Sequence, residues 1–312
     1  MKPHCVSVHP MPQAQADKLA AMFDVHVLPG EAAKLPIDAP WAKEVRILQT
    51  SGQWGANRAF MESMPKLEIV SCYGVGVDAV DIGYCKEKGI PVGNTPAVLN
   101  DDVADLALGL MLMASRRLAL GDRYVRAGRW TREGNMPLAR KLSGKTLGIL
   151  GLGRIGKQIA RRAAAFDMPV VYYGRSKQDV PFRFYDNLVA MARDVDVLCA
   201  ICPGGDATRN LINREVMEAL GPDGILVNVA RGSVVDEPAM VAALKSGKLG
   251  VAALDVFVAE PKVPEELFTL DNVVLQPHVG SATVETRAAM GDLVIENIRC
   301  HLEGRPLKAR VV

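Results

Sequence analysis

Short apolar segments alternate with amphipathic segments along the whole chain. Before residue 100, five apolar segments have the length of buried strands, and they read CVSVH, DVHVL, VRILQT, LEIVSCY and IPVGN. Between them, residues 13–23, 58–64 and 80–88 show the apolar spacing of helices. Strands that alternate with helices form a parallel sheet with helices on both faces. We therefore predict a doubly wound α/β unit at the start of the chain.

A second series of the same kind begins near residue 145. Its predicted strands are TLGILG, PVVYYG, residues 182–185, VDVLCAI, GILVNVA, VAALDVF and NVVLQPH. The predicted helices between them lie at 155–166, 187–193, 210–220 and 236–246. This alternation predicts a second doubly wound parallel sheet.

Two longer helical patterns complete the chain. Residues 101–128 are predicted as one helix, which Asn100 or Asp101 can cap and whose apolar centre should be buried. Residues 284–303 form a long amphipathic helix after the second series has ended. We therefore expect this last helix to return to the first unit.

The length and composition agree with two globular domains. A chain of 312 residues is too long for one ordinary core, and 49% apolar with 23% charged residues is typical of a soluble protein. The predicted domains are residues 1–99 with 286–312, and residues 100–285 inserted between them. The net charge of +2 gives no reason to expect nucleic acid or a membrane surface as a partner. The chain contains no apolar run of membrane-spanning length and no signal-peptide core.

Six cysteines are scattered along the chain, most of them in apolar runs where cysteine acts as a small hydrophobe. Cys199 and Cys202 could be a redox pair or half of a zinc site. The sequence offers no second CxxC and no His pair at zinc-site spacing, so we expect no metal. Simple packing in a reduced, cytoplasmic protein is the favoured interpretation.

The strongest local signal is a G-x-G-x-x-G pattern over residues 151–156, between an apolar strand and a helical pattern. In a dinucleotide-binding turn, Gly151 would permit the tight bend and Gly153 would let the backbone approach the pyrophosphate. Gly156 would let the helix pack on the strand. A glycine-rich turn without a ligand is the alternative, but the strand–turn–helix context favours a bound dinucleotide.

The end of the next strand indicates which dinucleotide is bound. NAD-binding domains usually carry an acidic residue about 20 positions after the glycine turn, where it binds the ribose 2′-hydroxyl. Gly174 stands at that place here, and Arg175, Ser176 and Lys177 follow it. Charged and hydrogen-bonding donors suit a 2′-phosphate. We predict NADP, with NADPH preferred over NADH; an ordinary basic loop is the alternative.

Three residues farther along the chain indicate the chemistry. Arg231 follows a strand, where its guanidinium could bind a carboxylate with two hydrogen bonds. His278 follows another strand and could deliver a proton to a ketone oxygen. Glu260 could bond the far ring nitrogen and fix the histidine tautomer, if the fold brings it there. Together, the three residues predict reduction of a 2-oxo acid. The alternative is that Arg231 is an ordinary surface residue and His278 a structural one.

A glycine-rich turn, Gly74-Val75-Gly76, follows a strand of the first domain. Its backbone amides could bind the carboxylate of a substrate. A simple strand-to-helix turn is the alternative.

The motifs GLGRIG, VARGSVVDE, LDVFVAEP, PHVGSAT, YGVGVD and NTPAVLNDDVADLA together resemble those of the D-isomer-specific 2-hydroxyacid dehydrogenases. The resemblance covers nearly the whole chain. The segments GRSK and GRPLKARVV are similar to the glyoxylate/hydroxypyruvate reductase and hydroxyphenylpyruvate reductase branch. This resemblance implies a Rossmann-type nucleotide domain inserted in a flavodoxin-like substrate domain, and a homodimer.

The resemblance also implies roles for residues. Arg231 would bind the substrate carboxylate and carbonyl, and Glu260 would pair with His278, the proton donor. Val75 and Gly76 would contact the substrate, and Trp54 stands in a loop that usually carries smaller residues near it. The implied cofactor contacts are Gly151, Leu152, Gly153, Arg154, Ile155, Gly156, Gly174, Arg175, Ser176, Lys177, Cys202, Pro203, Thr208, Val229, Ala230, Arg231, Asp255, His278 and Gly280.

We therefore expect NADPH-dependent reduction of glyoxylate and hydroxypyruvate to D-2-hydroxy acids. Bulkier 2-keto acids, such as hydroxyphenylpyruvate or 2-ketogluconate, are the alternative substrates. A non-catalytic protein that senses the dinucleotide is disfavoured because Arg231, Glu260 and His278 are all present.

Overall fold

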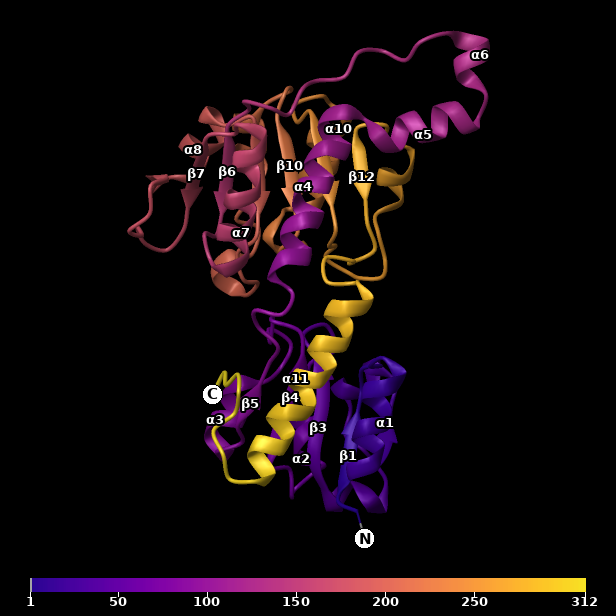
Figure 1. The fold of residues 1–312 in the computed structure, drawn as a ribbon, viewed down its shortest axis with the longest axis vertical. Coiled ribbons are helices and arrows are strands. Elements are labelled where there is room, and N and C mark those ends of the chain that lie inside the picture. Colours follow the sequence, from indigo (N-terminus) through magenta and orange to yellow (C-terminus); the bar gives the residue numbers. More distant parts are fainter. Residues whose placement is uncertain (1) are drawn as a thin grey trace. The chain divides into compact units, whose positions relative to one another are not determined.

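The computed structural model describes residues 2–312, which form two compact α/β units (Figure 1). The split unit combines the chain up to Leu99 with Ala282–Val312, and the inserted unit is Asn100–Ser281. The chain therefore leaves one unit, completes another and returns. The return lies just ahead of the last helix, slightly earlier in the chain than the predicted boundary at 285/286.

The split unit has a parallel sheet with the strand order β2-β1-β3-β4-β5. The strands are β1 (His4–Ser7), β2 (Asp24–Val27), β3 (Val45–Ser51), β4 (Ile69–Tyr73) and β5 (Val92–Gly93). Its helices are α1 (Gln13–Met22), α2 (Arg58–Glu62), α3 (Ile82–Lys88) and α11 (Val284–Leu302), with 3₁₀ turns η1 (Gly30–Lys34) and η2 (Pro40–Glu44). This order is that of the flavodoxin-like fold and confirms the predicted class.

The last helix belongs to the split unit. In Figure 1, α11 runs beside β4, and it also packs against α1. The Tyr73 hydroxyl at the end of β4 donates a hydrogen bond to the Arg287 carbonyl at 2.7 Å. The Ser71 hydroxyl donates to the Val294 carbonyl at 3.2 Å. The two distant parts of the chain thus build one core.

The inserted unit has a parallel sheet with the strand order β12-β11-β10-β9-β6-β7-β8. The strands are β6 (Leu147–Leu150), β7 (Val170–Tyr173), β8 (Arg183–Tyr185), β9 (Val197–Ala200), β10 (Ile225–Asn228), β11 (Val251–Leu254) and β12 (Val273–Leu275). The order reverses between β6 and β9, and this switch point is where open α/β sheets bind ligands, at the carboxyl ends of the strands. The predicted Rossmann-type unit is confirmed.

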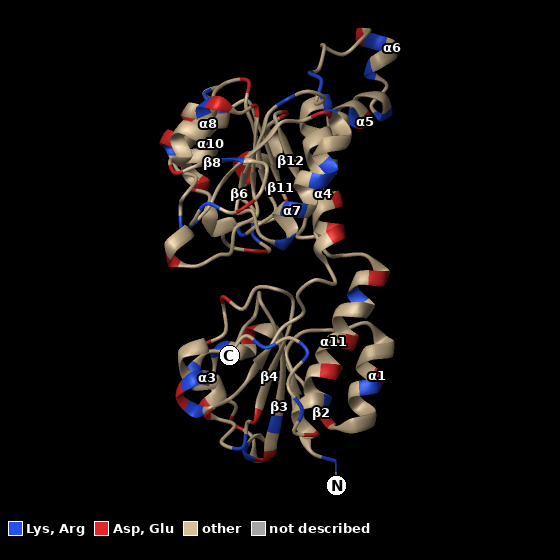
Figure 2. Ribbon diagram, turned by 60° about the vertical axis from the view of Figure 1, so that its left-hand side comes forward, with Lys and Arg blue, Asp and Glu red and all other residues tan. Residues whose placement is uncertain are grey.

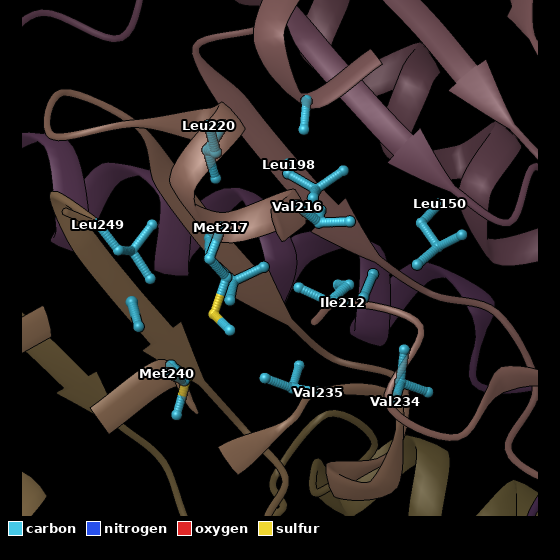
Figure 3. Close-up of a cluster of buried hydrophobic side chains, with 14 of the residues drawn as sticks. Leu150, Leu198, Ile212, Val216, Met217, Leu220, Val234, Val235, Met240 and Leu249 are labelled. Carbon is cyan, nitrogen blue, oxygen red and sulfur yellow. The ribbon is translucent and has the colours of Figure 1, made fainter. Parts of the chain in front are cut away.

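Helices cover both faces of this sheet. They are α4 (Asn100–Arg116), α7 (Arg154–Ala163), α8 (Leu188–Asp194), α9 (Arg214–Leu220) and α10 (Glu237–Lys245). On one face, Leu198, Met217 and Met240 belong to a continuous cluster of buried side chains (Figure 3). Truncating one such leucine or methionine to alanine costs about 2–5 kcal/mol of stability. The cluster therefore packs α8, α9 and α10 against this face of the sheet.

On the other face, an ion-pair network joins α4 to α7. The Arg162 guanidinium of α7 donates to Asp101 at 2.9 Å and also to Asp105. The Arg162 side chain is only 19% exposed, so these pairs are less screened than ordinary surface pairs. Elsewhere, charged side chains of both signs are mixed over the helices and loops of each unit (Figure 2).

The predicted single helix over 101–128 is wrong after Arg116. Arg117 has a left-handed backbone (φ +52°) that ends α4, and α5 (Leu118–Arg126) and α6 (Arg129–Glu133) follow. Expected burial holds for α4, but Leu118, Val125 and Trp130 are 50–59% exposed. We call residues 117–142 the arm (Figure 1). In the sequence, the apolar pattern of the arm looks like that of a buried helix, because the spacing of apolar residues does not show whether another element covers them.

The helix predicted over 210–220 begins later, at Arg214. The Asn213 side chain accepts the Val216 N–H at 3.1 Å and caps α9. Asn210 has a left-handed backbone (φ +51°), so the helix cannot begin at this residue. Within residues 2–312, the structure has no helix long and apolar enough to cross a membrane.

Candidate active site

The glycine turn joins β6 to α7 beside the switch point. Gly151 has φ +102°, and a Cβ there would lie 2.7 Å from the backbone of Cys202, at the end of β9. A Cβ on Gly156 would lie 2.5 Å from the Gly151 carbonyl oxygen. Gly153 is exposed, has open space on its Cβ side and directly precedes α7. Backbone N–H groups at such a helix start bind phosphate groups, so the turn fits a dinucleotide pyrophosphate.

The loop after β7 is tied to this turn through Gln178. The Gln178 side-chain amide donates to the Leu152 carbonyl at 2.9 Å. The Gln178 backbone N–H donates to the Tyr172 hydroxyl at 2.6 Å. Gln178 is absent from the predicted site residues, because nothing in the sequence pairs it with the glycine turn.

This loop carries the residues predicted to select the cofactor. A Cβ on Gly174 would have no other atom within 4 Å, which leaves space beside the strand end. Arg175, Ser176 and Lys177 follow and are exposed. Two cationic side chains and a hydroxyl in a loop anchored to the dinucleotide turn are the donors that a 2′-phosphate needs.

His278 and Glu260 meet in the inserted unit. Nδ1 of His278 lies 2.7 Å from Oε2 of Glu260, whose Oε1 accepts the Phe257 N–H at 3.0 Å. Burial, the largest single effect, raises the pKa of the Glu260 carboxyl, but four opposing effects together leave that pKa lowered. These effects are the hydrogen bond and the charge of His278, the Phe257 amide and the charge of Arg231. An ionised carboxylate only accepts hydrogen bonds, so it assigns a proton to Nδ1 and leaves Nε2 for chemistry.

The backbone of His278 is strained and is held by Asp255. His278 has φ +54°, a left-handed conformation that costs a residue with a side chain on the order of 1–3 kcal/mol. Its N–H donates to the Asp255 carbonyl at 2.9 Å. The Asp255 carboxylate, 2% exposed, accepts the N–H groups of Val279 at 2.7 Å and Gly280 at 2.9 Å. Burial raises the pKa of Asp255 despite these bonds.

Arg231 is presented by a fixed turn after β10. Buried Asn228 accepts the Ala230 N–H at 3.1 Å and donates to the Arg231 carbonyl at 3.0 Å. A Cβ on Gly232 would lie 1.9 Å from the backbone of Phe257, so the loops after β10 and β11 touch. Phe257 is the residue whose N–H binds Glu260. Asn228 is also absent from the predicted site residues, although a polar residue that ends an apolar strand is a usable signal.

The other predicted cofactor positions also lie near carboxyl strand ends of the inserted unit. The Thr208 hydroxyl donates to the Pro203 carbonyl at 2.8 Å, which shapes the loop after β9. Cys202 is 8% exposed, and burial raises the pKa of its thiol to about 11. Val229 and Ala230 are buried between the end of β10 and Arg231. Within the described residues, Cys199 and Cys202 are free and buried, which favours packing over a redox role.

The predicted substrate contacts form a separate group in the split unit. The Val75 carbonyl accepts the Asn94 side-chain amide at 2.8 Å, and a Cβ on Gly52 would lie 2.3 Å from the Gly76 oxygen. The Val75 side chain is 38% exposed. Both carbonyl groups are thus held inside the unit at the end of β4, while the Val75 side chain reaches solvent.

Trp54 packs within the split unit. Its indole lies against Gly30, where a Cβ would come within 2.1 Å of the ring. Its backbone N–H donates to the Ser51 hydroxyl at 3.3 Å. Trp54 is neither fully buried nor fully exposed, so the structure gives it a packing partner and still leaves part of its surface accessible.

The sequence motifs and this geometry agree with known proteins. Residues 108–280 match the family model of the D-isomer-specific 2-hydroxyacid dehydrogenase NAD-binding domain. The chain belongs to the D-isomer-specific 2-hydroxyacid dehydrogenase family, and its inserted unit is an NAD(P)-binding domain.

Among similar proteins, glyoxylate/hydroxypyruvate reductase A of Arabidopsis thaliana is 52% identical, over 86% of each chain. Hydroxyphenylpyruvate reductase of Plectranthus scutellarioides is 48% identical, over 96% of this chain and 95% of that protein. A crystal structure of the NADPH-dependent glyoxylate/hydroxypyruvate reductase of Sinorhizobium meliloti, in complex with NADP and malonate, is 40% identical. It superposes with a TM-score of 0.94, covering 100% of this chain and 97% of that one.

Proposed function

We propose that this protein catalyses the NADPH-dependent reduction of glyoxylate and hydroxypyruvate to D-2-hydroxy acids. The observation that carries the proposal is the 2.7 Å contact between His278 Nδ1 and Glu260 Oε2 at the strand ends that also carry Arg231. A histidine oriented by a carboxylate is suited to general acid–base catalysis. The family and the names of the relatives support the reaction class.

NADPH, when bound, supplies the hydride, and the side chains supply the rest. The Glu260 carboxylate stabilises the doubly protonated ring of His278, whose Nε2–H then passes to the carbonyl oxygen of the substrate. The Arg231 guanidinium holds the substrate carboxylate and polarises the carbonyl. Oxidation of the hydroxy acid uses the same groups in reverse, with neutral His278 accepting the proton.

The cofactor preference rests on the loop after β7. Gly174 removes the negative charge that would repel a 2′-phosphate, and Arg175 with Lys177 adds positive charge. The relative from Sinorhizobium meliloti, described as NADPH-dependent, supports this assignment. Gly151, Gly153, Gly156 and the start of α7 would hold the pyrophosphate.

The substrate range has one alternative. Hydroxyphenylpyruvate reductase is among the similar proteins, so bulkier 2-keto acids, including 2-ketogluconate, are the competing substrates. A screen of 2-oxo acids with NADPH, compared by kcat/KM, distinguishes them. Highest kcat/KM on glyoxylate and hydroxypyruvate supports the proposal, and clearly higher values on an aromatic or sugar-derived acid refute it.

The catalytic assignment is tested by His278→Gln. We expect kcat to fall on the order of 10²-fold or more, the usual loss when general acid–base help is removed. NADPH binding, measured by fluorescence titration, should change little because the glycine turn is intact. A variant that keeps wild-type turnover refutes the role. A wild-type protein that binds NADPH and reduces no 2-oxo acid would instead be the dinucleotide-sensing alternative.

We also propose a cytoplasmic homodimer. The arm exposes Leu118, Val125, Trp130 and Leu138, the last 97% exposed. Exposed apolar side chains gathered on one segment mark an association surface. Light scattering on the purified protein tests the assembly: twice the mass of the 33.6 kDa chain supports a dimer, and a monomer refutes it.

A further inference from the structure

Two histidines and an aspartate share one face at the edge of the split unit's sheet. His4 pairs directly with Asp24 across the parallel strands β1 and β2, and His26 lies two positions after Asp24. Side chains alternate between the two faces of a sheet with a period of two, so all three point to the same face. Their nearest ligand atoms lie within 4.8 Å of one another. The pairing of two strands thus gathers ligands that are separated in the sequence.

The two imidazoles are already in contact. Nδ1 of His4 lies 2.8 Å from Nε2 of His26, and the rings are stacked with their centroids 5.1 Å apart. The same Nδ1 lies 3.7 Å from Oδ2 of Asp24. A contact between two ring nitrogens requires one proton between them, and a cation that binds imidazole nitrogens can take the place of that proton.

The ring of His26 is held in its plane by Trp41. The indole of Trp41 stacks on His26 with centroids 3.8 Å apart and an interplanar angle of 3°. Trp41 in turn packs against the hydrophobic core of the split unit. The position of the His26 ring is therefore fixed by its neighbours.

Two of the three ligand-atom distances require only a small adjustment for zinc, and the third, between Asp24 and His26, lies within 4.8 Å. Ligand atoms about 2.0–2.1 Å from a tetrahedral zinc ion lie roughly 3.3 Å from one another. The His4–His26 contact would lengthen and the His4–Asp24 distance would shorten, each by about half an ångström. The Asp24 side chain is 62% exposed, so it can move, and solvent can reach the site.

We propose that His4, Asp24 and His26 bind one zinc ion, with water as the fourth ligand. Imidazole nitrogen and carboxylate oxygen are zinc ligands, and a fourth position filled by water gives the tetrahedral geometry that zinc prefers. The ion would join the edge strand β2 to β1 at their amino ends, whereas Val75 and Gly76 follow the carboxyl end of β4 in the same parallel sheet. Its effect is therefore on the stability of the split unit. The sequence alone predicts no metal, because His4, Asp24 and His26 have no recognisable zinc-site spacing along the chain.

Zinc binding is tested on the full-length protein without an affinity tag, after treatment with a chelator. Titration with zinc chloride, followed by calorimetry, should show one tight site per chain, and zinc should raise the melting temperature. His26→Gln and Asp24→Asn should each weaken binding by 10-fold or more and abolish the rise in melting temperature. Cobalt(II) in place of zinc should give visible absorption typical of tetrahedral coordination in wild type alone.

His301→Gln is the matched control. His301 also pairs with a carboxylate, Glu68 at 3.5 Å, in the same unit. We expect this variant to bind zinc like wild type. Equal losses in His301→Gln and His26→Gln would overturn the proposal, as would a wild type that binds no zinc.

A double variant excludes binding elsewhere. His278 and Glu260 are also potential ligands, so zinc retained at full affinity by His4→Gln/His26→Gln would place the ion at another site and overturn the proposal. If the histidine variants fail to fold by circular dichroism, Asp24→Asn, which changes an exposed side chain, decides the question by itself.

Discussion

The buried carboxylate of Asp255 accepts the backbone N–H of Gly280 at 2.9 Å, and so closes the turn in which His278 is held. Its other oxygen accepts the backbone N–H of Val279 at 2.7 Å. Asp255 thus acts on the backbone, where it holds the left-handed conformation that directs the imidazole. The catalytic pair therefore depends on a carboxylate that takes no part in the chemical step of the proposed mechanism.

Asp255→Asn should weaken this turn. An amide offers one oxygen where the carboxylate offers two, so one of the N–H groups of Val279 and Gly280 loses its partner at a cost of about 1–3 kcal/mol. We expect a lower melting temperature and a fall in kcat of about 10-fold or more, if that energy is what holds the imidazole in place. Steady-state kinetics and thermal melts test this. Wild-type values of both would show that the turn does not need the carboxylate.

Glu260→Gln should change the pH dependence of activity. Without the carboxylate, the protonated ring of His278 loses its stabilising partner, so the alkaline limb of the kcat/KM profile for reduction should move to lower pH. Measuring the profile with glyoxylate from about pH 5 to 9 tests this. Glu260→Asp keeps the charge and serves as the control, with a smaller displacement expected. Superimposable profiles for wild type and Glu260→Gln would contradict the orienting role.

The same pair affects stability at acid pH. The pKa of the folded Glu260 carboxyl is lowered, so the folded state gains stability above the unfolded pKa of about 4.3. That gain is lost as the pH falls through the lowered, folded pKa. The stability difference between wild type and Glu260→Gln should therefore shrink from about pH 6 toward pH 3, as measured by urea unfolding. A constant difference would show that the charge does not contribute.

Arg175→Ala tests the choice of cofactor. A charge-assisted hydrogen bond contributes roughly 1.5–3 kcal/mol, or about 10- to 150-fold in affinity. The KM for NADPH should rise by that order, and the KM for NADH should hardly change because NADH has no 2′-phosphate. Arg183→Ala, which removes an exposed arginine of β8, is the control. Equal losses with both cofactors would exclude Arg175 as the phosphate ligand.

Trp54→Ala tests the size of the substrate site. If the accessible part of the indole limits the substrate side chain, its removal should raise the ratio of kcat/KM for phenylpyruvate to that for glyoxylate. Gly30 loses its packing partner at the same time, so the melting temperature should fall. A lower melting temperature with an unchanged ratio would identify Trp54 as a packing residue only.

Much of the fold follows from local patterns. Each predicted strand is present because apolar runs of strand length between helical segments have few other ways to be buried, and parallel pairing follows from the alternation. The end of α4 at Arg117 could not be predicted, since arginine has no preference for the left-handed backbone found there. The exposed face of the arm escapes prediction for a related reason: an apolar pattern does not show what covers it.

The candidate site, too, could be predicted from the sequence only in part. Residue type and strand-end position point to Arg231, Glu260 and His278, and the structure supplies the Glu260–His278 contact. Asn228 holds the turn after β10 through local hydrogen bonds to Ala230 and Arg231, whereas Gln178 holds its loop through the distant Leu152 carbonyl. The role of Gln178 depends on a three-dimensional contact between loops, and the sequence alone carries little trace of it. The cluster of His4, Asp24 and His26 is equally invisible in the sequence because strand register creates it.

Because one unit is inserted into the other, the residues proposed for the reaction and those expected to contact the substrate lie in different stretches of the chain. The glycine turn and the groups proposed for hydride and proton transfer all come from one uninterrupted stretch, Asn100–Ser281. The residues of the split unit expected to contact the substrate, Trp54, Val75 and Gly76, lie before it. Under the proposed roles, mutations upstream of residue 100 would change the accepted acid and leave the groups for proton transfer and cofactor binding untouched.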